Sequence, residues 1–175
     1  KVSGTMGREL DSLADMVSFG VVPGSVVFHL LEASTLSSYS FVALLIPALS
    51  AYRLAKFNID ERQVDGFIGL NTPANTLFFI SFPLISHFQP DHFLNYWIAI
   101  PELLIVLTVL MSFAMVSEIP LFAFKFKNLS FADNKLRFSF IGLSVVLLVM
   151  LQFAAIPLLV LLYLFLSIAT QFSTK

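Results

Sequence analysis

Two aspartates lie one helical turn apart near the start of the chain, where an apolar stretch begins. Asp11 and Asp15 follow Gly7 at four-residue intervals, and Ser18 comes three residues later. On an α-helix this spacing places all four residues on one face, with the two carboxylates about 6 Å apart. Carboxylates that close repel each other unless a cation lies between them or one takes up a proton. Oxygen ligands of this kind suit a divalent cation such as Mg²⁺ or Mn²⁺.

The same residues also have a simpler interpretation. Glu9, Asp11 and Asp15 suit a solvated first helical turn, where negative charge complements the positive end of the helix dipole. Gly7 would let a ligand approach the backbone closely, but glycine near a helix start is common for conformational reasons alone. The spacing by itself leaves both interpretations open.

The composition indicates an integral membrane protein. Of the 175 residues, 58% are apolar and only 12% are charged, and the mean hydropathy is +0.89. A soluble domain has about 25% charged residues. The formal net charge of −1 gives no basic surface for nucleic acid, so we expect no nucleic-acid partner. The absence of cysteine excludes disulfides, thiolate catalysis and cysteine-bound metals.

The apolar stretches predict an all-α fold, a polytopic membrane bundle of five or six transmembrane helices. Each such helix needs about 20 mostly apolar residues. The expected spans are residues 10–31, 39–57, 73–87, 94–116 and a final block, 138–170. The third span is short enough to need tilting or local bilayer thinning, and Pro101 interrupts the fourth. The final block makes two short spans if the chain turns near residues 152–157.

If the spans alternate in direction, all basic residues lie on one side of the membrane. The basic segments are residues 1–8, 53–62, 125–137 and 175. The breaks at 34–38 and 88–92 carry no lysine or arginine. The positive-inside rule makes the basic side cytoplasmic. Six spans place residue 175 on that side, whereas five would place it outside.

Three segments on this side resemble one known family. The stretch from Gly7 to Asp15 resembles the second half of the CDP-alcohol phosphatidyltransferase signature, D-x-x-D-G-x-x-A-R-x8-G-x-x-x-D-x-x-x-D. The longer string ELDSLADMVSFGVVP, residues 9–23, is similar almost residue by residue to the phosphatidylserine synthase branch. YRLAKFN and GLNTPA, residues 52–58 and 69–74, resemble that branch's R-L-A-R-F-N and G-L-P-T-P-A. Lys56 and Asn71 depart from the commoner residues.

The resemblance implies transfer of the phosphatidyl group from CDP-diacylglycerol to the hydroxyl of L-serine, with release of CMP. By position in the family motif, Asp11 is a metal ligand, and Asp15 is the general base and a further metal ligand. The implied site holds two metal ions, Mg²⁺ or Mn²⁺, and Gly7 contacts the CDP moiety. The metals would neutralise the diphosphate while a carboxylate removes the hydroxyl proton.

Four further polar residues are candidates for contact with the substrates. Arg53, near the end of the second span, suits a phosphate or the serine carboxylate, although an arginine there can also snorkel to the interface. Ser18, Asn58 and Thr72 suit hydroxyl or amide contacts to serine. The alternative roles of these three residues are helix capping and interhelical hydrogen bonding.

We interpret residues 1–175 as a single membrane-embedded domain. Residues 1–74 carry the motifs, and residues 94–175 add transmembrane helices. The family's first two aspartates and its Ala-Arg pair would lie before Lys1. We therefore expect about two further spans upstream, and no activity from the 175 residues alone. The resemblance also implies a bacterial cytoplasmic membrane, an active site facing the cytoplasm, and a homodimer.

Three other functions stay open on the sequence. Another member of the family would use glycerol 3-phosphate or inositol as the acceptor. A cation- or proton-coupled transporter also carries paired intramembrane carboxylates, but near the middle of the membrane. A purely structural membrane subunit would tolerate asparagine in place of Asp11 and Asp15.

Overall fold

The computed structural model describes residues 4–60, 67–121 and 134–173, which fold as an all-α bundle. The helices are α1 (Thr5–Met16), α2 (Val22–Glu32), α3 (Leu45–Ile59), α4 (Thr72–Phe88), α5 (Leu94–Ile98), α6 (Pro101–Val116), α7 (Lys135–Leu151) and α8 (Ala155–Ser173). A π-helical stretch, Val17–Val21, joins α1 to α2, and a 3₁₀ stretch, Ser37–Leu44, leads into α3. Two short strands, β1 (Phe67–Ile68) and β2 (Pro120–Leu121), pair antiparallel.

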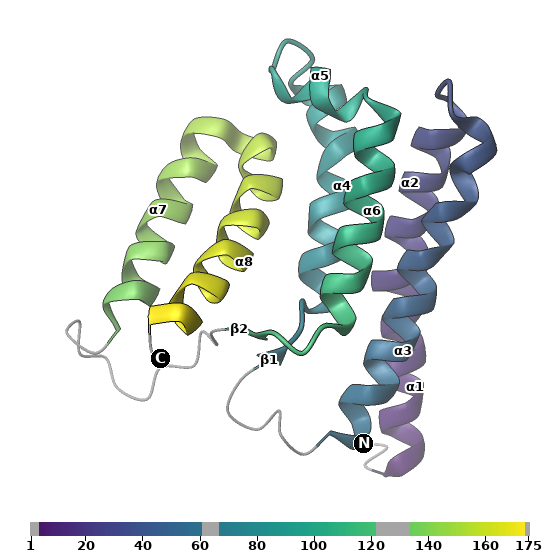
Figure 1. Cartoon of the computed structure of the whole chain (residues 1–175), viewed down its shortest axis with the longest axis vertical. Helices are drawn as coiled ribbons and strands as arrows, with labels where there is room; N and C mark the ends of the chain where they lie inside the picture. Colours follow the sequence, from purple (N-terminus) through teal and green to yellow (C-terminus); the bar gives the residue numbers. More distant parts are fainter. Residues whose placement is uncertain (1–3, 61–66, 122–133, 174–175) are drawn as a thin grey trace.

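The long helical segments run alternately in opposite directions (Figure 1). The rod formed by α1 and α2 leaves the end of the bundle that holds the N-terminus, α3 returns to it, α4 leaves, and α6 returns. The hairpin of α7 and α8 then lies beside α4 and ends at the same level. The described lysines and arginines all belong to segments at this end, which we call the basic end; they are Arg8, Arg53, Lys56, Lys135 and Arg137. Residues 1–3, 61–62, 125–133 and 175 of the predicted basic segments lie outside the described residues.

Helix length and apolarity confirm the predicted membrane bundle. In the described part of the chain, Met6–Glu32, Ser37–Ile59 and Arg137–Thr170 are long and apolar enough to cross a membrane. Pro101–Val116 is a shorter apolar helix. The last long stretch turns back at Gln152, whose φ is 50°, and so forms the two helices α7 and α8.

The predicted interruption of the span 94–116 at Pro101 is confirmed. The short helix α5 ends at Ile98, and the continuous helix begins only at Pro101. Ile100 has an extended backbone, with φ −84° and ψ 106°, because a following proline disfavours the helical conformation. Proline is well tolerated in the first turn of a helix, where its missing N–H group has no partner to lose.

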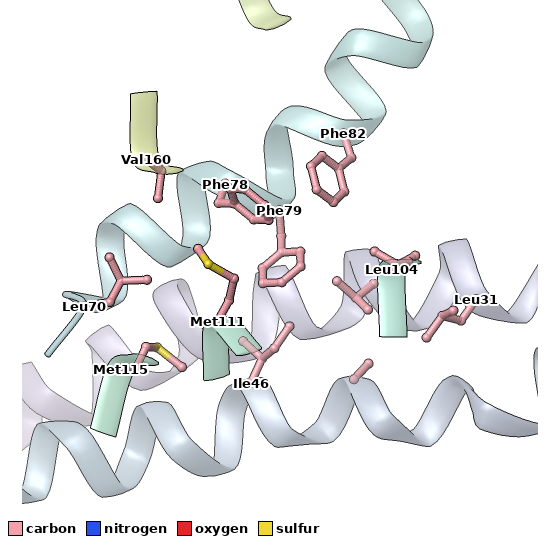
Figure 2. Packing of buried hydrophobic residues seen from close by; sticks show 12 residues of the cluster. Leu31, Ile46, Leu70, Phe78, Phe79, Phe82, Leu104, Met111, Met115 and Val160 are labelled. Atoms are coloured by element: carbon pink, nitrogen blue, oxygen red, sulfur yellow. The ribbon is translucent and has the colours of Figure 1, made fainter. Parts of the chain in front are cut away.

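A buried apolar cluster joins α2, α3, α4 and α6. Phe78 and Phe79 of α4 contact each other edge to face, with ring centroids 5.1 Å apart. Figure 2 shows Phe79 pointing from α4 toward Ile46 of α3, with Met111 of α6 beside it. These side chains are almost completely buried, so α4 is held in the centre of the bundle.

Close backbone packing holds the first rod against α3. A methyl group added at Gly20 would lie 3.1 Å from Cα of Pro47 and 3.1 Å from Cβ of Ser50. One added at Gly24 would lie 2.9 Å from Cδ of Pro47. Small residues four apart allow this approach, which membrane helices use in place of a hydrophobic driving force. The contact fixes the rod along α3.

The hairpin of α7 and α8 is attached at the opposite end. The Nε2 atom of Gln89, just after α4, donates a 3.0 Å hydrogen bond to the carbonyl of Leu151. Its Oε1 atom accepts a 3.0 Å bond from the backbone N–H of Ala154. The rings of Phe88 and Phe153 stack beside them. The turn between α7 and α8 is therefore joined to the end of α4.

The segment before α4 supplies hydrogen bonds to the end of α6 and to the residues just after it. The backbone N–H of Leu70 donates a 2.9 Å bond to the carbonyl of Ala114, and that of Gly69 donates a 2.9 Å bond to the carbonyl of Ile119. Gly69 has φ +73°, and a Cβ there would lie 2.5 Å from the carbonyl oxygen of Met115. Only glycine fits this position, because it tolerates a positive φ and leaves room for the α6 carbonyls.

We expect Gly69→Ala to destabilise the protein by about 2 kcal/mol or more, because it combines left-handed strain with a steric clash. Thermal unfolding in detergent, followed by far-UV circular dichroism, measures the effect. Gly142→Ala is the control, because nothing lies within 4 Å of a Cβ at that position on α7. Equal unfolding temperatures for the two variants would contradict the conclusion that only glycine fits at position 69.

Candidate active site

A pocket of about 350 Å³ lies between α1, α3 and the start of α4 at the basic end. It is lined by Arg8, Asp11, Ser12, Asp15, Arg53, Leu54, Phe57, Asn58, Asn71, Thr72 and Pro73. The three segments that carry the sequence motifs therefore meet around one pocket, which we call the α1–α3–α4 pocket.

The α1 wall of this pocket is acidic. Asp11 and Asp15 lie one turn apart on a regular helix, the first exposed and the second half-buried. Within the described residues neither carboxylate has a hydrogen bond or an ion pair. Arg8, one turn earlier on the same helix, is exposed at the pocket. The two carboxylates are thus available to bind a cation.

The donor atoms of the α1 wall fit a divalent metal ion. Members of the family that the motifs resemble generally use such ions. Asp11 and Asp15 offer hard oxygen ligands, which Mg²⁺ and Mn²⁺ prefer. In the described ranges, no group of three or more His, Cys, Asp or Glu residues surrounds a common point. The described part of the chain therefore offers two carboxylates that could hold such an ion.

The α3 wall carries a buried cation and an amide. Arg53 is 7% exposed, and its Cζ lies 6.0 Å from the centroid of the Phe57 ring. Its Nε and Nη2 atoms are buried and have no hydrogen-bond partner among the described residues. Asn58 donates a 2.9 Å hydrogen bond from Nδ2 to Oγ of Ser12 on α1. This bond joins the α3 wall to the acidic wall.

The α4 wall is the amino end of a 17-residue helix. Asn71 caps this helix, because its Oδ1 accepts a 2.7 Å hydrogen bond from the backbone N–H of Ala74. Thr72 and Pro73 follow in the first turn and also line the pocket. Asn71, where the resemblance has proline, therefore has a local structural role as a cap.

Away from the pocket, a hydrogen bond joins α4 to the π-helical stretch that follows α1. Pro23 has no N–H to donate to a carbonyl one turn earlier, and the helix widens over Val17–Val21 just before it. Oγ1 of Thr76 on α4 lies 2.9 Å from the carbonyl of Phe19, inside this wide stretch, and 2.9 Å from the carbonyl of Thr72 one turn earlier on α4, so these two carbonyls share its hydroxyl proton. A threonine on α4 thus supplies a donor to a carbonyl of the rod formed by α1 and α2, four residues before Pro23.

We expect Thr76→Val to lower stability by about 1–3 kcal/mol, because it removes a buried donor from the Phe19 carbonyl while keeping the side-chain shape. Thr76→Ser keeps the hydroxyl and is the matched control, so it should unfold closer to the unchanged protein. Thermal unfolding in detergent compares the two. If serine destabilises as much as valine, the hydrogen bond has no stabilising role.

The structure brings most of the predicted site residues together. Asp11, Asp15, Arg53, Asn58 and Thr72 all line the α1–α3–α4 pocket. Two others do not line it. Gly7 is half-buried at the start of α1, and Ser18 is exposed within the π-helical stretch. The wider helical turn there changes the angular spacing that had placed Ser18 on the same face as the aspartates.

Three polar lining residues were not proposed from the sequence as contacts. Arg8 lies three residues before Asp11 and seven before Asp15, so helical spacing could have placed it on their face. Ser12 lies next to Asp11, but its contact with α3 depends on how the helices pack. Asn71 was noted only as a departure from the family pattern, and its capping bond could have been inferred from the proline two residues later.

Comparison with known proteins identifies similar sequences. A family model described as CDP-alcohol phosphatidyltransferase matches residues 1–119. A relative from Methanocaldococcus jannaschii, named CDP-diacylglycerol–serine O-phosphatidyltransferase, is 42% identical over 77 residues, which cover 43% of this chain and 35% of the relative. Relatives with the same name are 38% identical over 68 residues in Bacillus subtilis and 34% identical over 91 residues in Helicobacter pylori J99.

These matches are partial on both sides. The Bacillus subtilis match covers 39% of this chain and 38% of the relative, and the Helicobacter pylori match covers 51% and 38%. The matched part of the chain thus spans little more than a third of these relatives. No solved structure matches the chain.

Proposed function

The chain belongs to the CDP-alcohol phosphatidyltransferase family, and from this membership we propose that the protein transfers the phosphatidyl group of CDP-diacylglycerol to the hydroxyl of L-serine. The products would be phosphatidylserine and CMP. The observation that carries the proposal is the α1–α3–α4 pocket at the end of a membrane bundle, where two carboxylates have no partner among the residues that the structure describes. The names of the similar proteins favour serine over glycerol 3-phosphate or inositol as the acceptor.

Each carboxylate has a proposed role in the reaction. The serine hydroxyl oxygen attacks the β-phosphorus of the donor, the hydroxyl proton passes to Asp15, and CMP leaves as the phosphoanhydride bond breaks. Asp11 and Asp15 would hold Mg²⁺ or Mn²⁺, which supplies positive charge for the diphosphate when bound. Asp15 is half-buried at the pocket, so its carboxylate can reach a bound hydroxyl.

The remaining candidates are proposed to contact the substrates. Arg53 would bind an anionic group, because it lines the pocket and its charge has no ion-pair partner among the described residues. Asn58 and Thr72 line the same pocket and would contact serine. Gly7, as a contact for the CDP moiety, and Ser18 stay predictions, since neither lines the pocket.

The pocket's place in the bundle supports an orientation. All described lysines and arginines lie at the end that carries the pocket, so the positive-inside rule favours a pocket open to the cytoplasm. We propose a bacterial cytoplasmic membrane as the location. A homodimer would use a surface other than Gly20 and Gly24, because both pack against α3 within the chain.

The same placement argues against an ion-coupled transporter. Coupling carboxylates of transporters lie near the middle of the membrane, at the interface between repeats. Asp11 and Asp15 instead lie in the first helix, close to the end of the bundle (Figure 1). An enzyme that meets a water-soluble amino acid and a lipid headgroup requires this position.

We expect Asp11→Asn and Asp15→Asn each to lower metal-dependent CMP release by about 10²-fold or more, because each removes a charged ligand or base. The assay uses the full-length protein in liposomes with CDP-diacylglycerol, Mg²⁺ or Mn²⁺, and L-serine. Glu9→Gln is the matched control. Glu9 is an exposed acid on the same helix but does not line the pocket. The activity of the Glu9→Gln variant should therefore change less than about threefold.

The acceptor is tested in the same assay by replacing serine with glycerol 3-phosphate or inositol. Release with serine alone supports the proposal. CMP release with another alcohol would leave the family assignment intact but identify a different acceptor. Full activity in both aspartate variants would contradict the proposed catalytic site.

A further inference from the structure

A second cavity lies between α4, α5, α6 and α8, away from the basic end. It has a volume of about 240 Å³ and shares no lining residue with the α1–α3–α4 pocket. Its lining side chains are all aliphatic or aromatic, and each of the four helices contributes; Phe82, Trp97, Leu107 and Leu161 are one from each. We call it the α4–α8 cavity. A lining of this kind favours an apolar occupant.

The α4–α8 cavity lies just beneath one surface of the membrane. Leu94, Trp97 and Ile98 of α5 line it, and α5 is at the end of the bundle opposite the N-terminus (Figure 1). Tyr96 and Trp97 are exposed, with their rings edge to face and the centroids 5.7 Å apart. Exposed tyrosine and tryptophan gather at the interface between membrane and water. The cavity is therefore at the depth of the acyl chains of the leaflet at this end, which we call the far leaflet.

The floor of the α4–α8 cavity belongs to the core of the bundle. Phe78, Phe82 and Leu104 line it and are almost completely buried, and Figure 2 shows them within the apolar cluster. Pro157 and Leu158 line it from the start of α8. An occupant would therefore contact the core and the α7–α8 hairpin at once, unlike a lipid that only touches the outer surface.

A more polar cavity of about 450 Å³ adjoins the first one, and the two share Ile98 and Leu104. Ser86 and Asn95 contribute to its lining. Oγ of Ser86 donates a 2.9 Å hydrogen bond to Oδ1 of Asn95, and Nδ2 of Asn95 donates to two backbone carbonyls just before α5. No charged side chain is among the described residues that line either cavity. The polar cavity can therefore accommodate uncharged polar groups without selecting a particular charged head group.

We propose that the α4–α8 cavity binds one acyl chain of a phospholipid from the far leaflet, with the glycerol and ester groups of that lipid in the adjoining polar cavity. An apolar cavity and a polar one that meet near the membrane surface match the two parts of such an amphiphile. The chain adds dispersion contacts between the core and α8. This inference does not depend on the proposed reaction, because the two sites share no lining residue.

An acyl chain suits this place better than a helix of another protein. A transmembrane helix extends to the membrane surface and is about 10 Å across with its side chains. Packed into the cavity, it would meet α5, whose Leu94 and Trp97 line the cavity from the surface side. A chain ends inside the membrane and can bend around Ile98, which both cavities share.

Trp97 provides a direct test, because it lines the cavity and is the one tryptophan of the sequence. The protein is reconstituted in vesicles of phosphatidylcholine whose stearoyl chain carries two bromine atoms at its middle, which quench tryptophan fluorescence on contact. It is then transferred to detergent, which dilutes loosely bound lipid. We expect Trp97 to stay quenched, and native mass spectrometry to find about one brominated lipid per chain. Trp97→Phe gives the background fluorescence.

Challenge with unbrominated lipids tests what the cavity recognises without any substitution. Long-chain phosphatidylcholine and long-chain phosphatidylglycerol should both restore the fluorescence, because the chain is what binds. Phosphatidylcholine with six-carbon chains should restore it at least about tenfold less effectively at equal concentration, because it buries far fewer methylene groups.

A pair of double variants tests the place of the chain. Leu107→Phe with Leu161→Phe narrows the cavity from α6 and α8, and should lower the retained brominated lipid by about threefold or more. Leu110→Phe with Ile168→Phe is the matched control, because these residues are exposed on the same two helices and line neither cavity. The KM for CDP-diacylglycerol of the full-length protein should change less than about threefold in both variants.

Four results would overturn the proposal. Unquenched Trp97 in the brominated vesicles would show that protein covers the cavity. Complete loss of quenching in detergent, or equal retention by the narrowed and control variants, would leave only ordinary surface lipid. A raised KM for CDP-diacylglycerol in the narrowed variant alone would assign the cavity to a chain of the donor substrate. Absence of CMP release would contradict the proposed function and leave the lipid measurements valid.

Discussion

Two backbone hydrogen bonds, from Leu70 to Ala114 of α6 and from Gly69 to Ile119 just after α6, hold the pocket in its shape. The last carbonyls of a helix have no partner within the helix, so donors must come from elsewhere. Here the donors belong to the segment that leads directly into α4. The start of α4 is therefore fixed against α6, and Asn71 and Thr72 line the same pocket as Arg53.

The membrane fold could largely be predicted because length and hydropathy determine which segments cross a bilayer. The six long helical segments follow the apolar stretches, and the final block turns at Gln152, within the expected range. The break at Pro101 could also be predicted, because a proline disfavours the helical conformation of the residue before it. The wide helical stretch before Pro23 could not, because it depends on how that proline's missing N–H group is accommodated. For Pro23 this involves Thr76, more than fifty residues away in sequence.

The candidate site was predictable where it depended on depth in the membrane. Asp11, Arg53 and Thr72 lie in separate motifs, yet alternating spans place all three at one end of the bundle, where the structure has them around one pocket. Contacts that depend on the rotation of a helix about its own axis could not be predicted from depth in the membrane. The bond from Asn58 to Ser12 requires α1 and α3 to face each other at one particular angle. The close packing of Gly20 and Gly24 against α3 sets that angle.

The pocket keeps its opposite charges on separate walls. Asp11 and Asp15 on one side and Arg53 on the other form no ion pair among the described residues. A direct pair would satisfy these charges within the protein and leave the pocket little affinity for either sign. Kept apart by rigid helices, the carboxylates attract a cation and the guanidinium attracts an anion. A pocket of this kind is suited to a reaction whose reactants are a metal-bound diphosphate and a zwitterion, since together they supply both charges.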